Sequence, residues 1–292
     1  MTDPTGLVAA QTQRHTSLDP LLPPTTVPDR GDMLVATLAR GTQVAGLLDI
    51  RTERGRRVWA LTPLLGDHGG EGMEAVLRAL RARLDRTPVP ADSVCTLAWP
   101  SLDADCTRPL LDHGLVPVLA LGVRVGATPR NPSGAASVAV RRSSSRDAGA
   151  VARLVRRAEP SQRCSSLVPK SFLDGTSPGS EWMAESGSRT GEPLAGMMRL
   201  GEAHRRTPGF AGLLPEGNWG WIVRLLVDPR KRGRGVGGAL VAAAHDVFAR
   251  RGLERSLTWY SPLDSPAAAF WHRQGYRPLW TVWQCEPASA LR

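Results

Sequence analysis

The fold is decided by residues 219–238, which read WGWIVRLLVDPRKRGRGVGG. The opening nine are almost all apolar, which is typical of a mostly buried β-strand. Glycines at 233, 235 and 237 follow, and apolar residues then recur at helical spacing from Leu240 to Phe248. Gly252 comes directly after two arginines and suits the left-handed end of a helix. The stretch predicts a strand, a glycine-rich turn and an amphipathic helix, in that order.

The glycine-rich turn suits a phosphate-bearing small molecule. Free N–H groups at the start of a helix and the positive end of the helix dipole together favour anions. Glycine lets the backbone approach an anion closely, and the turn adds positive charge through Arg230, Lys231, Arg232 and Arg234. The spacing is not Gly-x-Gly-x-x-Gly with a later acidic residue, and no Gly-Lys-Ser/Thr follows. The spacing therefore does not favour a site for hydride transfer or for nucleotide hydrolysis.

Strands and helices are expected on both sides of this segment. Residues 137–141 and 194–200 have the pattern of strands, and Asp147 stands where an N-cap opens a helix. Beyond the central helix, residues 256–260 predict a strand and residues 266–275 a short helix that ends at glycine.

The chain is expected to divide into two lobes. Prolines predict an irregular leader over residues 1–31, and a stretch rich in Pro, Gly and Ser predicts a linker at 126–136. They bound an N-terminal lobe, 32–125, and a second domain, 137–292. The two resemble each other weakly: residues 44–48 match 194–198 in type. At a constant offset of 161, the pairs that recur are Leu102 and Leu263, Asp103 and Asp264, Gly114 and Gly275, and Pro117 and Pro278. We infer a duplicated unit whose first copy has drifted.

The chain carries a formal charge of +10, and nearly all of its positive charge is arginine, since Lys170 and Lys231 are the only lysines. Compositional bias explains this better than nucleic-acid binding, which needs clustered basic residues interleaved with aromatics. The cysteines are scattered without metal-ligand spacing, so we expect reduced, structural thiols and no metal; they are Cys95, Cys106, Cys164 and Cys285. Without a membrane-length apolar run or a signal peptide, a cytoplasmic protein is expected.

Two linked motifs resemble the GNAT superfamily of acyl-CoA N-acyltransferases. Its signature is Arg/Gln-x-x-Gly-x-Gly/Ala, five residues after a strand valine, and Val227, Arg232, Gly235 and Gly237 match it. Residues 264–276 resemble the family's downstream helix motif. The resemblance implies an α/β (α+β) fold of two tandem GNAT-like lobes, each a mixed, mostly antiparallel sheet flanked by helices. It also implies acetyl-CoA as co-substrate.

The resemblance further implies where the coenzyme binds. The main chain of Leu225, Leu226 and Val227 would pair with the pantetheine arm like an added strand. The pyrophosphate would lie on a run of seven residues, and Asp264 stands at the family's asparagine; the run is Arg232, Gly233, Arg234, Gly235, Val236, Gly237 and Gly238. The Val227 N–H would stabilise the tetrahedral intermediate.

This sequence departs from the family at the groups that move protons. The strand before Val227 carries Arg224 but no glutamate, so we consider three flanking residues as the base: Glu202, His204 and Glu216. Trp271 replaces the tyrosine that protonates the leaving thiolate. Tyr260 is our substitute acid, and Tyr276 is expected in the core. One or two tryptophans are expected to line an acceptor pocket, from among Trp219, Trp221, Trp259, Trp271, Trp280 and Trp283.

We therefore expect acetyl transfer to a primary amine, on a small natural product or a peptide N-terminus, by direct attack in a ternary complex. No covalent enzyme intermediate is expected, which disfavours Cys164 or Cys285 as nucleophile. A catalytically silent CoA-binding scaffold or sensor is the alternative. In the first copy, Gly69 and Glu74 align with Arg232 and Gly237, and a carboxylate at the cradle would repel the pyrophosphate. That lobe is expected to be inactive. The acceptor and the oligomeric state stay open.

Overall fold

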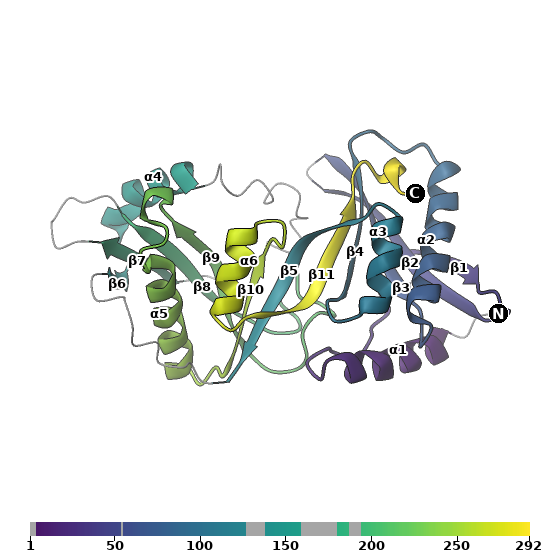
Figure 1. Ribbon diagram of the computed structural model, residues 1–292, viewed down its shortest axis with the longest axis horizontal. Helices are drawn as coiled ribbons and strands as arrows, with labels where there is room; N and C mark the ends of the chain where they lie inside the picture. The colour runs from purple at the N-terminus through teal and green to yellow at the C-terminus, as the bar shows by residue number, and fades with distance from the viewer. Residues whose placement is uncertain (1–3, 54, 127–137, 159–179, 187–193) are drawn as a thin grey trace. The chain divides into compact units, whose positions relative to one another are not determined.

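The computed structural model describes residues 4–53, 55–126, 138–158, 180–186 and 194–292. Two compact units are formed, and Figure 1 labels the elements of both. Unit 1 comprises Met1–Ala120, Ala211–Glu216 and Pro278–Arg292, and unit 2 comprises Leu121–Phe210 and Gly217–Arg277. Among the helices of the described residues, none is long and apolar enough to cross a membrane.

Unit 1 is a mixed sheet with helices packed on it. Its elements are α1 (Pro4–Leu18), β1 (Asp32–Thr37), β2 (Gln43–Glu53), β3 (Arg56–Leu64), α2 (Gly69–Asp85), β4 (Ser93–Pro100), α3 (Ala104–Asp112), the start of β5 (Val116–Val125), most of β11 (Arg277–Cys285) and η6 (Ala288–Ala290). β1, β2 and β3 pair antiparallel, β3 and β4 pair parallel, and β11 pairs antiparallel with β4. α2 connects the parallel strands and buries Met73, Val76 and Leu80 in the core.

Unit 2 repeats this plan. Its elements are the end of β5, β6 (Val138–Arg142), η1 (Ser145–Asp147), α4 (Ala148–Ala158), β7 (Ser180–Ser186), β8 (Gly196–Ala203), β9 (Trp219–Val227), η5 (Pro229–Lys231), α5 (Val236–Arg250), β10 (Arg255–Tyr260) and α6 (Ser265–Arg273). β6 to β9 form an antiparallel series, and β9 pairs parallel with β10. α4 packs on one face through Leu154, Met183 and Met197.

Glycines let α5 pack closely on the opposite face of the unit 2 sheet. A Cβ on Gly220 would lie 2.5 Å from the Phe248 ring, and a Cβ on Gly196 would lie 2.9 Å from Val236 and 3.0 Å from Leu240. Such distances leave no room for a side chain. The helix that follows the glycine-rich turn is thereby fixed against β8 and β9.

The predicted fold class is confirmed: the chain is a mixed, mostly antiparallel α/β fold with a repeated element order. The strand expected at 219–227 is β9, and the neighbouring elements differ from the expected bounds by one to three residues. The duplication is visible in matching details. α3 and α6 are both nine residues long, with Asp103 and Asp264 at their N-caps, and Gly114 and Gly275 have φ angles of 81° and 82°.

The leader expected to be irregular is in part a helix, because Pro4 stands at the first position of α1, where proline is tolerated, and the next proline, Pro20, follows the last residue of the helix, Leu18. Leu7, Gln11 and His15 recur every four residues and are all buried. This is the buried face of α1. The last fifteen residues, Pro278–Arg292, also differ from the expected division, since they pack with unit 1. The expected linker lies mostly outside the described residues.

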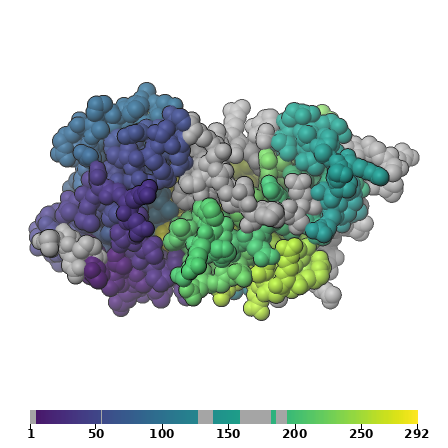
Figure 2. All heavy atoms as spheres, turned by 180° about the vertical axis from the view of Figure 1, so that it is seen from behind, coloured from purple at the N-terminus to yellow at the C-terminus, as the bar shows by residue number. Residues whose placement is uncertain are grey.

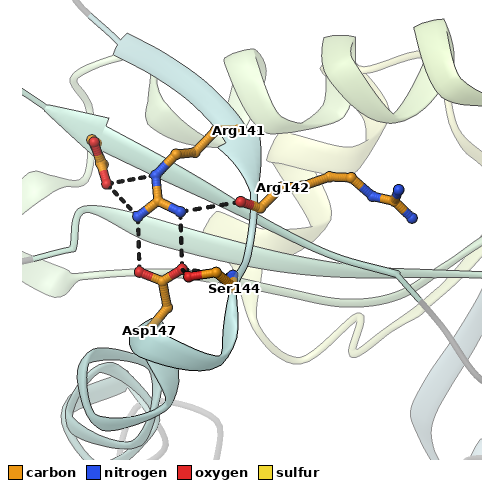
Figure 3. A network of polar contacts seen from close by, with 5 residues as sticks. Arg141, Arg142, Ser144 and Asp147 are labelled. Atoms are coloured by element: carbon orange, nitrogen blue, oxygen red, sulfur yellow. Dashed lines mark hydrogen bonds and ion pairs between the residues drawn. The ribbon is translucent and has the colours of Figure 1, made fainter.

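Asp147 was expected to be an N-cap. It is instead the third residue of a capping box, in which Ser144 is the N-cap of η1. The Ser144 N–H donates to the Asp147 carboxylate at 2.7 Å. Figure 3 shows the Arg141 guanidinium bonded to this carboxylate, at 2.8 Å. Arg141 also donates to the Glu185 carboxylate on β7 at 2.7 Å. These bonds hold the pKa of Asp147 well below its usual range, chiefly through Arg141. The network joins β6, β7 and the start of α4.

Replacing Gly220 with alanine tests the packing of α5 on β9. Because the added methyl would overlap the Phe248 ring, we expect Gly220→Ala to lower the free energy of unfolding by about 1–3 kcal/mol, and Phe248→Leu to restore part of it. Urea denaturation measures both. Gly149→Ala is the matched control: Gly149 is an exposed residue of α4, where a Cβ would meet only the end of the Arg153 side chain at 3.5 Å, and the variant should stabilise slightly. Equal stability of Gly220→Ala and wild type would contradict the packing.

Candidate active site

The two parallel strands of unit 2 diverge. β9 and β10 pair only from Gly220 opposite Ser256 to Ile222 opposite Thr258. Residues 224–227 of β9 continue to pair with β8 alone. At the point of divergence, the Thr258 hydroxyl donates to the Ile222 carbonyl at 3.1 Å. A bulge in the β8–β9 pairing lies at the same level, between Arg199 and Leu200, and bulges bend and twist a strand.

The divergence leaves backbone groups of β9 facing away from β8. The Asp228 N–H donates to the Ala195 carbonyl at 2.9 Å, on the side of β8. Successive residues of a strand direct their backbone groups to alternate sides. The N–H and C=O of Val227 and Leu225 therefore face the edge from which β10 has separated, and those of Leu226 face β8. Of the three residues predicted to pair with the pantetheine arm, Val227 and Leu225 present their main chain to the free edge.

The turn after β9 is held by a buried carboxylate. Asp228 is only 4 % exposed. It caps η5 by accepting the Arg230 N–H at 3.0 Å, and it forms an ion pair with Arg157 at 3.4 Å. Its own carbonyl accepts the Lys231 N–H at 2.8 Å. Sequence reasoning assigned Asp228 no role, although an Asp-Pro pair before a glycine run is a turn signal.

The predicted cradle is open and free of acidic residues. Gly235 is the N-cap of α5 with a left-handed φ of 79°, and the Ala239 N–H already donates to its carbonyl at 2.9 Å. The three preceding N–H groups, of Val236, Gly237 and Gly238, come before the helical bonding pattern starts. No acidic residue lies in this first turn. A Cβ on Gly238 would meet nothing within 4 Å, so an anion has access.

The basic residues of the turn lie beside these N–H groups. Residues 232–235 are all exposed, and Gly233 has a φ of 75° with open space around it. Arg232 and Arg234 are thus on the solvent side of the turn that leads into α5. Exposed guanidinium groups, unpaired helix N–H groups and the helix dipole together make an anion-binding site.

Two other predicted coenzyme residues have packing roles. A Cβ on Gly237 would lie 3.0 Å from the Phe270 ring of α6 and 3.7 Å from Val227. Glycine at 237 therefore brings α5 and α6 together at the end of β9. Asp264 is the N-cap of α6, where its carboxylate accepts the Ala267 N–H at 3.1 Å.

Tyr260 is buried, and its hydroxyl is paired with an exposed histidine. The Tyr260 hydroxyl is 3.0 Å from Nε2 of His272, and burial raises the pKa of Tyr260 to about 12. Trp271, at the family's tyrosine position, is buried and packs edge-on against Phe270 and Tyr276. A phenol with so high a pKa is a weak acid toward a thiolate, so this geometry does not favour Tyr260 as the proton donor.

Tyr276 is in the core, as expected from its position after Gly275. Its hydroxyl is 2.9 Å from the Ser256 hydroxyl and 3.0 Å from Nε2 of His245, and burial raises its pKa. His245 is itself buried beside Arg124, and burial with that charge lowers its pKa to about 4. The imidazole is therefore neutral at physiological pH.

The structure does not place the three candidate bases near Val227. Glu202 pairs opposite Gly220 and forms an ion pair with Arg251 at 3.0 Å, and His204 and Glu216 lie in the segment between β8 and β9. At roughly 3.3 Å per residue, the start of β9 is about 26 Å from Val227. Glu202 and His204 therefore lie toward the opposite end of the strand from the predicted thioester site, and Glu216 belongs to unit 1.

The tryptophans and cysteines are mostly core residues. Trp219 and Trp221 are at most 1 % exposed, and Phe210 packs edge-on against Trp221 and stacks on Trp259. Trp280 and Trp283 are buried in unit 1. Burial raises the pKa values of the Cys95, Cys106 and Cys285 thiols, which suits structural thiols. Cys164 lies outside the described residues. A tryptophan-lined acceptor pocket stays a prediction.

Comparisons with known proteins agree with this geometry. Residues 148–276 match the model of the acetyltransferase (GNAT) family. A mycothiol acetyltransferase of Clavibacter michiganensis subsp. michiganensis is 37% identical over 76 residues, which are 26% of this chain and 25% of that protein. One of Clavibacter sepedonicus is 32% identical over 83 residues, or 28% of this chain and 27% of that protein. The matched segment thus spans about a quarter of these relatives' length.

Solved structures show the fold over most of the chain. A GCN5-related N-acetyltransferase from Sphaerobacter thermophilus has a TM-score of 0.55 and 16% identity, covering 97% of this chain and 91% of that one. A GCN5-related glucosamine N-acetyltransferase region of a fungal multi-domain GH3 β-N-acetylglucosaminidase has a TM-score of 0.50 and 15% identity, covering 86% of this chain and 32% of that one. The family match covers the diverging strands and the glycine turn of unit 2, and the chain is similar in fold to a GCN5-related N-acetyltransferase.

Proposed function

We propose that unit 2 binds acyl-CoA along the free edge of β9 and transfers its acetyl group to a primary amine. The observation that carries the proposal is the continuity between an unpaired strand edge and an anion site. Val227 ends β9, and the first free N–H groups of α5 follow nine to eleven residues later in the chain, after an exposed, arginine-rich turn. A long ligand with an amide-bearing arm and a pyrophosphate matches both features.

The chemistry follows from the backbone at the end of β9. The amine nitrogen attacks the thioester carbon, and the Val227 N–H donates to the oxygen that gains negative charge. The C–S bond then breaks, the amide C–N bond remains, and the proton lost by the amine balances the thiolate that leaves. Arg224 is the only titratable side chain within residues 223–227. The catalytic strand therefore supplies no base, and water is the carrier of this proton in our proposal.

The acceptor that we propose is a primary amine, on a small molecule or at a peptide N-terminus. The two relatives named for mycothiol match over a quarter of their length, and their similarity supports acetyl transfer rather than a particular acceptor. The alternative, a silent CoA-binding module, is motivated by Arg224 and Trp271 at positions where the resemblance implies a glutamate and a tyrosine.

Turnover with a panel of amines separates these two functions. We expect the full chain to release thiol from acetyl-CoA when small amines or peptides with free N-termini are present, measured with a thiol reagent and by mass of the acetylated product. Boiled protein and N-blocked peptides are the controls. Coenzyme binding without product across the whole panel would support the silent module instead.

The cradle is tested by placing a charge at Gly238. A side chain has room there in the free protein, and a carboxylate in the first turn favours the helix, so Gly238→Glu should fold normally. We expect it to weaken CoA binding at least 100-fold, because its charge faces the pyrophosphate. Gly238→Gln, of equal size but neutral, is the matched control and should lose less. Calorimetric titration measures both affinities; unchanged binding by Gly238→Glu would place the pyrophosphate elsewhere.

Tyr260 is tested as the acid by replacing it with phenylalanine. Its hydroxyl is engaged with His272 and its pKa is about 12, so we expect kcat of Tyr260→Phe to stay within about threefold of wild type. A loss above 100-fold with unchanged coenzyme affinity would restore Tyr260 as the proton donor.

The tyrosine pKa values also predict a stability change with pH. Both of the chain's tyrosines are buried with raised pKa values, whereas an unfolded tyrosine ionises near pH 10. A raised folded pKa gives stability that is complete below about pH 10 and falls as pH rises toward 12. Phenolate absorbance should therefore be small at pH 10.5 in the native protein and appear with unfolding. Ionisation of both tyrosines near pH 10 in folded protein would contradict their burial.

A further inference from the structure

Unit 1 has a strand divergence of the same kind as unit 2. β3 and β4 pair in parallel from Arg57 opposite Ser93 to Ala60 opposite Thr96, and the end of β3 continues beside β2 alone. The registers make the two sites comparable. Gly46 on β2 lies opposite Pro63, and Gly196 on β8 lies opposite Val227. Pro63 therefore occupies in unit 1 the position of Val227 in unit 2.

The free edge of β3 is already occupied by a side chain of α1. The Gln11 carboxamide donates from Nε2 to the Pro63 carbonyl at 3.2 Å, and its Oε1 accepts the Leu65 N–H at 2.7 Å. A donor and an acceptor two residues apart on one side of a strand are the pair that an added strand would use. Gln11 is 2 % exposed, so this amide satisfies the edge from inside the protein.

The remainder of the buried face of α1 fills the space beside this edge. Leu7 packs in a cluster with Leu64, and a Cβ on Gly66 would lie 3.1 Å from Leu7. His15 lies edge-on between Trp99 and Trp280, with ring centroids 5.5 and 5.8 Å away. Burial lowers the pKa of His15 to about 4, so the ring packs as a neutral group. Figure 1 shows α1 within unit 1, and in Figure 2 its purple outer side is at the surface.

The start of α2 is covered as well, unlike the start of α5. A Cβ on Gly69 would lie 2.9 Å from the Arg14 guanidinium, which forms an ion pair with Asp103. A Cβ on Gly70 would lie 2.5 Å from the Asp105 carbonyl. Counted from the helix starts, Gly70 corresponds to Gly237, where a Cβ would lie 3.0 Å from Phe270, but the next residue, Gly238, has open space around it.

The connection into α2 also lacks the anion-binding turn. Five residues, 64–68, separate Pro63 from Gly69, whereas eight residues, 228–235, separate Val227 from Val236. Measured from the helix starts, Glu71 of unit 1 corresponds to Gly238 and carries a carboxylate in the first turn. Glu74, expected at the cradle, is instead bound to Arg78 at 2.7 Å and His113 at 3.0 Å.

We propose that α1 is a permanent intramolecular occupant of a coenzyme-type cleft in unit 1, so that the chain loads one acyl-CoA, in unit 2 alone. Gln11 takes the backbone groups that an amide-bearing arm would use, Leu7 and His15 fill its path, and Arg14 with Asp103 covers the helix start. Pro63 has no N–H to offer a thioester oxygen.

Hydrogen exchange on the full chain, with and without saturating CoA, tests this proposal on two segments at once. We expect CoA to slow exchange in residues 228–239 and to leave residues 4–18 and 61–69 unchanged. Altered exchange of α1 or of residues 61–69 on adding CoA would overturn the proposal. If no segment responds, coenzyme binding by unit 2 fails, while the closed cleft of unit 1 still stands.

A matched pair of variants on α1 tests the contact itself. Gln11→Ala removes the partner of the Leu65 N–H, and we expect that amide to exchange about tenfold faster. Gln13→Ala, on the exposed side of the same helix, should leave it unchanged. Equal exchange in the two variants would overturn the assignment of Gln11.

Counting bound coenzyme gives a further check. Native mass spectrometry should find one CoA per wild-type chain and none on Gly238→Glu. A CoA retained by Gly238→Glu, with protection at residues 61–69, would show that the cleft of unit 1 is open.

Discussion

The structure depends on the divergence of two parallel strands joined by a helix. A βαβ unit with fully paired strands buries its backbone groups in the sheet, but strands that separate leave N–H and C=O groups that need partners. In unit 2 this happens beyond Ile222, and the main chain of Leu225 and Val227 is left facing the gap. In unit 1 the strands separate beyond Ala60, and the carboxamide of Gln11 forms hydrogen bonds with the backbone groups that this leaves without a strand partner. The backbone groups left unpaired by diverging strands can therefore be bonded by a ligand or by a side chain of the protein itself.

In each unit, close packing on the sheet fixes the helix that connects the two diverging strands. Gly46 and Gly196 lie at matching places on β2 and β8, and a Cβ on either would lie 2.9 Å from a side chain of α2 or α5. Because these helices cannot move away from the sheet without loss of packing, their N-terminal turns are held at the end of the strand before them. In unit 2, Asp228 then fixes the entry to the turn by bonds to Arg230 and Arg157. The N-terminus of α5 and the free edge of β9 are thereby held close together. A ligand that has both a pyrophosphate and an amide-bearing arm requires this arrangement.

Much of this was readable from sequence because the signals are local. The apolar run 219–227, the glycines after it and the spacing of Leu240 to Phe248 each specify one element through short-range sterics. The helix α1 was missed because its buried face shows only Leu7, Gln11 and His15, two of them polar. Their burial depends on β3, Trp99 and Trp280, far away in the sequence. Likewise, the contact of Gly237 with Phe270 depends on the tertiary packing of α5 against α6. The base among Glu202, His204 and Glu216 stays a prediction, because sequence proximity to a strand does not say which end of it a side chain lies at.

Three differences between unit 1 and unit 2 all act against the binding of an anionic ligand in unit 1. Pro63 removes an N–H from the edge of β3, the turn into α2 is shorter by three residues than the turn into α5, and Glu71 adds a carboxylate where unit 2 has Gly238. Each change weakens the binding of an anionic, amide-bearing ligand. Unit 1 also holds the C-terminal strand, because β4 pairs with β11. Six register pairs, from Trp280 opposite Pro100 to Cys285 opposite Cys95, tie the C-terminal segment to the first copy. The second copy in sequence therefore completes its chain in the sheet of unit 1, which gives a reason for a lobe with a filled cleft to persist.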